Sequence, residues 1–378
     1  MKSSWVEIDA SVLDKNIAAL RQAVATSTEL IFVVKADAYG HGLVPMARQA
    51  THAGVRWFGV AHMHEALALR RVLPDCDILV MGVVAPDDAP VLSVERITPI
   101  VVDAEHGRQL AGVARSANAT VRAHLKVDTG MGRLGVAWDQ ALDTFRVLRG
   151  EPGLQITGVC SHFAAVEPNQ PLRAGRQAER FTAVFREMEA LNGGPLFKHL
   201  SSSRAALYHP EWDFDAIRPG ICLYGYGAAR PDMRFHTRPF LQWKCTVMQV
   251  KDIPAGYPVG YYGTHVTSTP TRMAILSAGY ADGYNRALSN RGHVLIRGRR
   301  CRVIGRVSMN WITVDIGPEG QAQPGDEAIL IGQQGGASIW AGELAKLCRT
   351  IPYEILVGID HAAERRYISD ASTNPLSG

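Results

Sequence analysis

Near the start of the chain stands the run Glu29-Leu30-Ile31-Phe32-Val33-Val34-Lys35, in which five apolar residues lie between two charges. An apolar run without polar alternation is typical of a strand that is buried on both faces, as in a parallel sheet covered by helices. Similar runs recur along the first part of the chain. Their starts lie near Leu30, Trp57, Ile78, Ile97, Val121, Leu154, Phe197 and Ile217.

Helical patterns separate most of these runs. Segments 103–117 and 173–191 have helical periodicity, and an amphipathic helix capped by Asp9 precedes the first run. Strands that alternate with helices predict an α/β fold with a parallel sheet. Eight strand–helix units match a (β/α)8 barrel of TIM type, for which about 250 residues is typical. An open doubly wound sheet is the alternative, because some units are weak and the connection after Val84 is short.

The pattern changes after about residue 230. Apolar runs at 241–250, 271–278, 293–297 and 301–315 follow one another without intervening helices, and Gly and Pro punctuate them. This arrangement predicts a mainly β C-terminal domain. One helix is expected near its end, at 341–349. We therefore predict a barrel in residues 1–230 and a mainly β domain in residues 231–378.

The composition of the 378-residue chain is typical of a soluble globular protein, with 47% hydrophobic and 20% charged residues. The formal net charge of +4 gives no electrostatic signature of a nucleic-acid or membrane partner. The six cysteines form no C-x-x-C pair, and the N-terminus lacks the apolar core of a signal peptide. We expect a soluble cytoplasmic protein with reduced thiols.

Polar residues stand just past the carboxyl ends of the predicted strands. In a TIM barrel these positions face the active site. The loops after strands 7 and 8 commonly bind the phosphate group of a ligand. In this chain those loops contain serine hydroxyls and a glycine, which would let a phosphate come close to the backbone N–H groups. The strand-end residues are Lys35, Lys126, His162, Ser203, Arg218, Gly220 and Ile221.

A phosphate site in these loops would lie close to Lys35, because strand 1 neighbours strand 8 in a closed barrel, whereas Lys126 would lie across the barrel. A lysine on a strand beside a phosphate site indicates pyridoxal 5'-phosphate. Each feature also has a simpler explanation. Lys35 could be a solvated lysine at a strand end, the serines at 201–203 could cap a helix, and Arg218 could form an ordinary ion pair.

Two other patterns concern metal and dinucleotide sites. The sequence His62-x-His64-Glu65 could suggest a metal site, but we interpret it as the start of a helix and predict no metal. No G-x-G-x-x-G motif follows a predicted strand, which argues against a dinucleotide site.

The segment Val34-Lys35-Ala36-Asp37-Ala38-Tyr39-Gly40-His41-Gly42 resembles the alanine racemase family of fold type III pyridoxal-phosphate enzymes. Further family-like stretches follow in the same order at 126–135, 161–164, 217–221, 279–284, 305–309 and 352–354. The resemblance covers nearly the whole chain. It implies a barrel followed by a β domain, in agreement with the pattern of apolar runs and helices.

The resemblance also implies residue roles. Lys35 would carry the cofactor, and Arg218 would meet its pyridine nitrogen. A hydrogen-bond chain through His162 and Arg218 would assist Tyr280. The phosphate would be held by Tyr39, Ser203, Gly220, Ile221 and Tyr353.

The substrate carboxylate would bind Arg133, oriented by Lys126 as a carbamate. Tyr280 and Met309 would enter the site from the other subunit, which implies a head-to-tail homodimer.

Racemisation needs a base on each face of the substrate, because the two enantiomers have equal free energy. Lys35 would be one base and Tyr280 the other. A free tyrosine has a pKa near ~10, so its phenolate needs help from cationic or hydrogen-bonding neighbours. Arg218 will not give up its proton, so the cofactor's ring nitrogen should stay unprotonated and transamination should be suppressed.

Some residues depart from the family pattern. Most members have Asp where Asn310 stands, and the segments 201–204 and 357–361 also differ. We expect an L/D-alanine racemase, with a preference for serine or a broader range as the alternative. A decarboxylase of the same fold type would bring a different second-domain motif. A non-enzymatic pyridoxal-phosphate carrier would end near the barrel, whereas this chain continues well beyond it.

Overall fold

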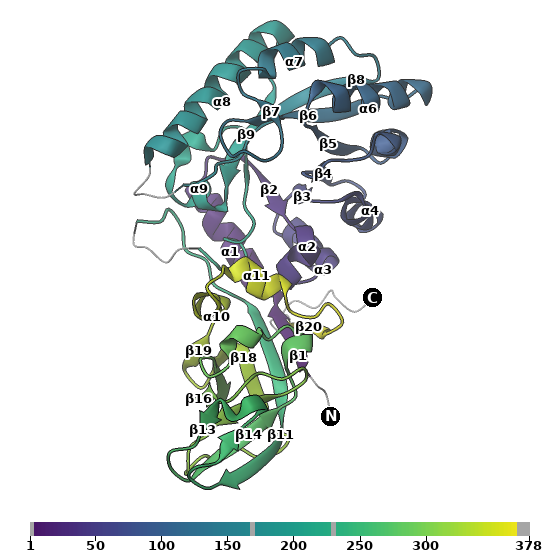
Figure 1. The fold of residues 1–378 in the computed structure, drawn as a ribbon. Helices are drawn as coiled ribbons and strands as arrows, with labels where there is room; N and C mark the ends of the chain where they lie inside the picture. Colours follow the sequence, from purple (N-terminus) through teal and green to yellow (C-terminus); the bar gives the residue numbers. More distant parts are fainter. Residues whose placement is uncertain (1–3, 167–170, 228–231, 369–378) are drawn as a thin grey trace. The chain divides into compact units, whose positions relative to one another are not determined.

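The computed structural model describes residues 4–166, 171–227 and 232–368 (Figure 1). Two compact units make up the fold. Of these described residues, those within 14–38 and 43–237 form the first, the barrel unit, and those within 1–13, 39–42 and 238–378 form the second, the β unit. None of the helices in the described ranges is long and apolar enough to cross a membrane.

The barrel unit holds eight parallel strands that close on themselves, because β10 pairs with β2 and β5 pairs with β6. In order around the barrel they are β2 (Glu29–Val33), β3 (Trp57–Val60), β4 (Asp77–Val80), β5 (Ile97–Val101), β6 (Val121–Asp128), β8 (Leu154–Cys160), β9 (Phe197–Ser202) and β10 (Ala216–Arg218). Each strand begins within one residue of a predicted run. The predicted (β/α)8 barrel is therefore confirmed, and the open sheet is excluded.

Helices follow the strands, and Figure 1 shows α4, α6, α7 and α8 outside them. Only the short η1 (Pro86–Asp88) and α5 (Ala89–Val94) connect β4 to β5, which explains the weak signal after Val84. The short β7 (Val136–Ala137) adds to β6. The other helices are α1 (Ala10–Ala23), α2 (Lys35–Gly40), α3 (Leu43–His52), α4 (Met63–Val72), α6 (Ala104–Ser116), α7 (Ala141–Leu148), α8 (Pro171–Asn192), α9 (Ser203–Tyr208) and η2 (Pro210–Trp212).

A cluster of fully or almost fully buried side chains fills the barrel. It draws one residue from each of several strands: Ile31, Leu79, Ile100, Cys160 and Ala216. Strands that are buried on both faces need apolar residues at successive positions, which is the pattern that the runs display.

The β unit is a mainly antiparallel sheet in the order β19-β18-β15-β16-β17-β14-β11-β1-β20. Its strands are β1 (Ser4–Asp9), β11 (Leu241–Ile253), β14 (Thr271–Leu276), β15 (His293–Ile296), β16 (Arg299–Val303), β17 (Ile312–Asp315), β18 (Glu327–Gln334), β19 (Ala337–Ile339) and β20 (Glu364–Ile368). A ribbon of β12 (Pro258–Val259) and β13 (His265–Val266) stands apart from that sheet. The short helices are η3 (Tyr261–Gly263), η4 (Tyr280–Asp282), η5 (Arg286–Leu288), α10 (Ala341–Cys348) and α11 (Pro352–Val357). The mainly β C-terminal domain is confirmed.

The first strand corrects the predicted domain boundary. β1 pairs with β11 in antiparallel and with β20 in parallel register, so it belongs to the β unit and not to a barrel of residues 1–230. The physical reason is its side-chain alternation. Val6 and Ile8 are completely buried on one face, and the long β11 offers the edge along which they pair.

Candidate functional site

Lys35 lies two residues beyond the end of β2, where α2 begins, next to the turn that follows β10. The N–H of Val33 donates to the carbonyl of Pro219 (2.9 Å), and this bond holds the end of β2 beside the turn after β10. Burial lowers the pKa of the Lys35 amine, the Arg133 cation lowers it further, and the Glu65 carboxylate opposes both. A lowered pKa increases the neutral fraction of the amine, the form that acts as a nucleophile or a base.

The backbone after Lys35 turns the wrong way for a helix of L-residues. From Ala36 to Tyr39 the φ angles are 53°, 52°, 51° and 54°, so α2 is left-handed. Each non-glycine residue in this conformation costs about 1–2 kcal/mol. Such strain persists only where surrounding contacts determine it, and it gathers at functional sites.

Arg218, at the end of β10, is bonded only to neutral acceptors. Its Nη1 donates to Nδ1 and to the carbonyl of His199 (2.6 and 2.8 Å). Its Nη2 donates to the carbonyls of Ser161 (2.6 Å) and Leu200 (3.0 Å) and, at 3.3 Å, to Nδ1 of His162. Among the described residues no carboxylate pairs with this guanidinium, and its Nε–H has no acceptor. Arg218 is therefore not an ordinary ion pair.

His162 follows β8, and its chemistry is set by the cations around it. Burial lowers the pKa of its imidazole to about 2, and Arg218, Lys126, Arg133 and Lys35 act in the same direction. The ring is therefore neutral at physiological pH. Because arginine can only donate, Nδ1 of His162 must be the acceptor and Nε2 must carry the proton.

Two further histidines continue this chain into the barrel, and the sequence reading missed both. Nδ1 of His199 accepts from Arg218, so its proton is on Nε2, which donates to Nδ1 of His124 at 2.8 Å. Both rings are buried, which lowers the pKa of His124 to about 3 and that of His199 well below its usual range. Arg218 is thereby fixed in orientation without a charge-neutralising partner.

The loops after β9 and β10 meet, as expected of a phosphate site. The N–H of Gly220 donates to Oγ of Ser203 (2.8 Å), and the N–H of Cys222 approaches the same oxygen at 3.4 Å. Ile221 lies between these two donors. The structure thus brings together the three barrel residues that were expected to hold a phosphate.

Lys126 lies on β6, in register with Cys160 of β8. Burial lowers the pKa of the Lys126 amine to about 8, and the cations of Arg218 and Arg133 also lower it. This amine therefore has a substantial neutral fraction near neutral pH.

Arg133 is carried by a loop that the Asp128 carboxylate organises. The two carboxylate oxygens of Asp128 accept the N–H groups of Gly130, Met131, Gly132 and Arg133 at 2.8–3.1 Å. Asp128 is not among the predicted site residues, although an Asp at the start of a glycine-rich loop is a recognisable turn signal.

Two of the predicted residues meet within the β unit. The rings of Tyr39 and Tyr353 lie 5.7 Å apart, centre to centre. Tyr39 is buried and Tyr353 is partly exposed.

Tyr280 and Met309 are also neighbours within the β unit. The N–H of Tyr280 donates to the carbonyl of Ser308 (3.0 Å), and the N–H of Ala281 donates to that of Met309 (2.9 Å). Gly279 permits this approach, because a Cβ there would stand 2.3 Å from both carbonyl oxygens. Tyr280 is 42% and Met309 55% exposed, so both side chains point away from the packed sheet.

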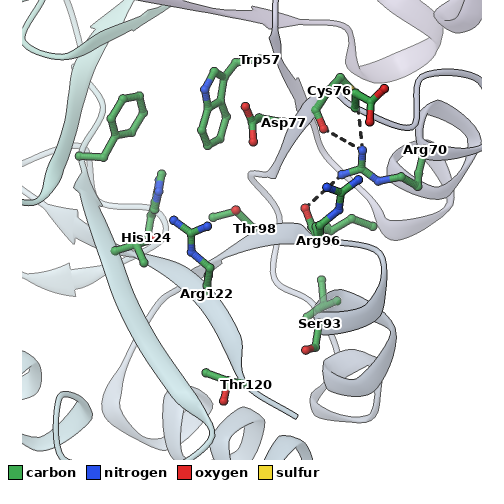
Figure 2. A pocket seen from close by; sticks show the side chains of 15 residues that line it. Trp57, Arg70, Cys76, Asp77, Ser93, Arg96, Thr98, Thr120, Arg122 and His124 are labelled. Carbon is green, nitrogen blue, oxygen red and sulfur yellow. Dashed lines mark hydrogen bonds between the residues drawn. The ribbon is translucent and has the colours of Figure 1, made fainter.

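A separate cavity of about 340 Å³ lies at the other end of the barrel (Figure 2). It is lined by residues at the amino ends of strands, among them Trp57, Asp77 and Ile97. Arg70 on its wall donates to the carbonyls of Glu95 (2.7 Å) and Cys76 (2.7 Å), which is a structural role. No predicted site residue lines this cavity, and in TIM barrels catalytic groups gather at the opposite end.

The sequence His62-x-His64-Glu65 begins α4, as expected. The Glu65 carboxylate accepts the N–H groups of Ala61 (2.8 Å) and His62 (3.1 Å). The two imidazoles stack 5.6 Å apart. No group of three or more metal-ligating side chains occurs in the described part of the chain.

Comparison with known proteins bears directly on this arrangement. Residues 8–228 match the family model described as alanine racemase, N-terminal domain, and residues 240–367 match alanine racemase, C-terminal domain. An alanine racemase from Syntrophobacter fumaroxidans is 39% identical over 363 residues, which is 95% of this chain and 96% of the relative.

Solved structures agree. An alanine racemase from Bacillus anthracis with bound L-Ala-P superposes with a TM-score of 0.90 at 31% identity, covering 97% of this chain and 95% of that one. One from Bartonella henselae with covalently bound pyridoxal phosphate has a TM-score of 0.85 at 29% identity, covering 97% of this chain and all of that one. The two domain matches follow each other in order along nearly the whole sequence, and this chain belongs to the alanine racemase family of pyridoxal-phosphate-dependent isomerases.

Proposed function

We propose that this chain interconverts L- and D-alanine with pyridoxal 5'-phosphate as its cofactor, and that Lys35 and Tyr280 are the two bases. The observation that carries the proposal is the Arg218 guanidinium, which is held by neutral acceptors and whose Nε–H has no acceptor among the described residues. The relatives are alanine racemases, which favours alanine over serine or a broader range of substrates.

The barrel residues fit the cofactor. Lys35 offers an amine whose pKa is lowered by burial, the Ser203–Gly220 contact forms a small polar cradle, and the Nε–H of Arg218 suits a ring nitrogen. Pyridoxal phosphate, when bound, supplies an electron-withdrawing ring that makes the Cα proton of an amino acid removable. The Bartonella henselae relative holds this cofactor covalently.

The phosphate is assigned first to the loops after β9 and β10. Ser203, Gly220 and Ile221 would bind it with a hydroxyl and backbone N–H groups. The phenols of Tyr39 and Tyr353 would add two further donors, and the proximity of their rings supports this role.

Lys35 moves a proton on one face of the substrate. Its amine takes the Cα proton of one enantiomer and returns a proton when the reaction runs the other way. Burial and the Arg133 cation favour the neutral amine that this step requires.

Tyr280 serves the opposite face. The phenolate is the form that accepts a proton, and a hydrogen-bond donor to its oxygen stabilises that form. His162 is suited to be that donor, because its Nδ1 is occupied by Arg218 and its Nε2 carries the proton. Arg218, inside the barrel, fixes the tautomer of His162, so the Nε2–H donor is preorganised.

Arg218 governs what happens after proton removal. Its guanidinium stays protonated, so it donates to the ring nitrogen without transferring a proton. We infer that this favours prompt return of the proton to Cα and suppresses transamination. Arg133 would bind the substrate carboxylate through its planar fork, and Met309 would close the side-chain pocket.

The second base comes from another copy of the chain. The β unit exposes Tyr261, Tyr262 and Trp311 at 65%, 88% and 46%, together with Tyr280 and Met309. Large exposed apolar groups on one domain indicate an interaction surface. We propose a head-to-tail homodimer in which Tyr280 and Met309 serve the partner's barrel. We also propose a cytoplasmic location, supported by the six cysteines, which are all free thiols.

The proposed activity is tested by a panel of L-amino acids with the purified protein. We expect a yellow protein whose racemisation of alanine exceeds that of serine and of every larger substrate, because the relatives share this activity. Borohydride should bleach the colour, and peptide mapping should find the label on Lys35. A chain without visible absorption, or one that racemises serine faster than alanine, contradicts the proposal.

Lys126 is expected to carry a carbamate. Its neutral amine, with a pKa of about 8, can react with carbon dioxide, and the cations of Arg133 and Arg218 would stabilise the resulting anion. NMR in ¹³C-bicarbonate should show a carbamate carbon that Lys126→Arg removes and Lys15→Arg leaves. Only the neutral amine reacts, so the signal should rise as the pH rises through about 8. A wild-type spectrum without this signal above that pH rules the carbamate out.

A further inference from the structure

Glu65 is a buried carboxylate that the proposed reaction does not use. It is only 5% exposed, yet no lysine or arginine in the described ranges forms an ion pair with it. Its partners are backbone N–H groups. A carboxylate retained at such a place must be stabilised by those hydrogen bonds, because burial of a charge is otherwise costly.

The bonds of Glu65 join two segments of the barrel. Oε2 accepts the N–H groups of Ala61 and His62 at the start of α4. Oε1 accepts the N–H of Ala36 at 2.7 Å, and Ala36 directly follows Lys35. One side chain therefore ties the beginning of α4 to the backbone that carries the lysine.

That backbone needs an anchor. Ala36 is the first residue of the left-handed turn, where every residue is strained. The N–H of Ala38 closes the turn on the carbonyl of Val34 (2.8 Å), and Asp37 holds its far side through the N–H of Leu43 (2.7 Å). No main-chain carbonyl in the described ranges accepts the N–H of Ala36, and the Glu65 carboxylate accepts it instead.

We propose that Glu65 is a positioning residue for Lys35: its carboxylate holds the first peptide group of the left-handed turn and so aims the lysine amine into the barrel. This proposal rests on the proposed function in one respect, namely that Lys35 is the cofactor lysine.

The charge of Glu65 has a second effect. The charged groups that face Lys35 are the Arg133 cation and the Glu65 carboxylate, while the nearby His162 is neutral. Arg133 lowers the pKa of Lys35 and Glu65 raises it. Removing the carboxylate should therefore lower the pKa of Lys35, so that the amine becomes reactive at a lower pH.

The test uses Glu65→Gln and Glu65→Asp in the full chain. Competitive acylation of the cofactor-free protein across a pH series, read by mass spectrometry, measures the reactivity of Lys35. For Glu65→Gln we expect the labelling midpoint to fall by about one pH unit. We also expect the affinity for pyridoxal phosphate to fall about tenfold, because one N–H loses its charged acceptor. Glu65→Asp keeps the charge but shortens the reach, so its midpoint should stay in place while its affinity falls.

Asp103→Ala is the matched control. Asp103 caps α6 by accepting the N–H of His106 at 2.7 Å, so its loss weakens a barrel helix without touching the backbone after Lys35. Thermal stability should fall, while Lys35 labelling and cofactor affinity should stay as in the wild type.

The labelling needs neither cofactor nor substrate, so it tests the effect of Glu65 on Lys35 even if the wild-type chain binds no pyridoxal phosphate. A wild-type chain that does not bind the cofactor would contradict only the proposed function. If Glu65→Gln does not fold, Glu65→Asp decides the matter through affinity. The positioning role is overturned if Glu65→Gln keeps both the wild-type midpoint and affinity, or if Glu65→Asp binds as tightly as the wild type.

Discussion

Lys35→Ala is expected to reduce alanine racemisation by about 10⁴-fold or more in both directions, because it removes the amine that holds the cofactor and one of the two bases. Lys35 is partly buried beside the Arg133 cation and the Glu65 carboxylate, and burial lowers its pKa. Its truncation therefore removes an unfavourable buried charge, and the variant should fold. Initial rates from L-alanine and from D-alanine, with saturating pyridoxal phosphate, measure the effect.

Lys15→Ala provides the control for this substitution. Lys15 lies exposed on α1 in the barrel unit and should be replaceable without loss of rate. Added methylamine offers a second check, since a small free amine can partly replace a missing lysine base. Racemisation by Lys35→Ala at more than a hundredth of the wild-type rate would be incompatible with Lys35 as the cofactor lysine.

Tyr280→Phe is expected to lower the rate of racemisation by about 10²–10⁴-fold, the usual contribution of a positioned general base. The side chain is 42% exposed in the β unit and the substitution removes only the hydroxyl, so folding should be unaffected. Cofactor binding should survive, because Lys35 and the phosphate loops are unchanged. Visible absorption and kcat, measured on the same preparation, separate these effects.

Tyr257→Phe is the matched control, since Tyr257 is 43% exposed in the same unit and has no proposed role. Mixing Lys35→Ala with Tyr280→Phe tests whether the phenol comes from the partner. A mixed dimer would then have one site with both defects and one intact site, so activity should reappear. If each site used its own Tyr280, both sites would be defective and the mixture would stay inactive.

Strand periodicity predicted the barrel well, because a strand buried on both faces leaves an unmistakable apolar run. It also located the ends of strands, which is why Lys35, Ser203 and Arg218 could be named as site residues. The same method passed over β1. The alternating pattern of β1 is short, and the strand forms by pairing with β11, which lies far along the chain.

The residues that sequence reading missed act through contacts that no local pattern reveals. His124 and His199 lie inside strands, and their role appears only when β6, β9 and β10 come together in the closed barrel. Glu65 was recognised as part of a helix start, which is correct, but its second oxygen reaches the segment after β2. Tyr280 was assigned through family resemblance alone, since its neighbours in the chain carry no sign of catalysis.

The central claim is that Lys35 and Tyr280 exchange protons at opposite faces of one carbon. Exchange of the Cα proton with deuterated water, followed separately from L-alanine and D-alanine, tests it most directly in wild-type protein and in Tyr280→Phe. The wild type should exchange both enantiomers, whereas Tyr280→Phe should exchange only the enantiomer whose proton faces Lys35. Equal exchange from both enantiomers in the variant would contradict the assignment of Tyr280 as the second base.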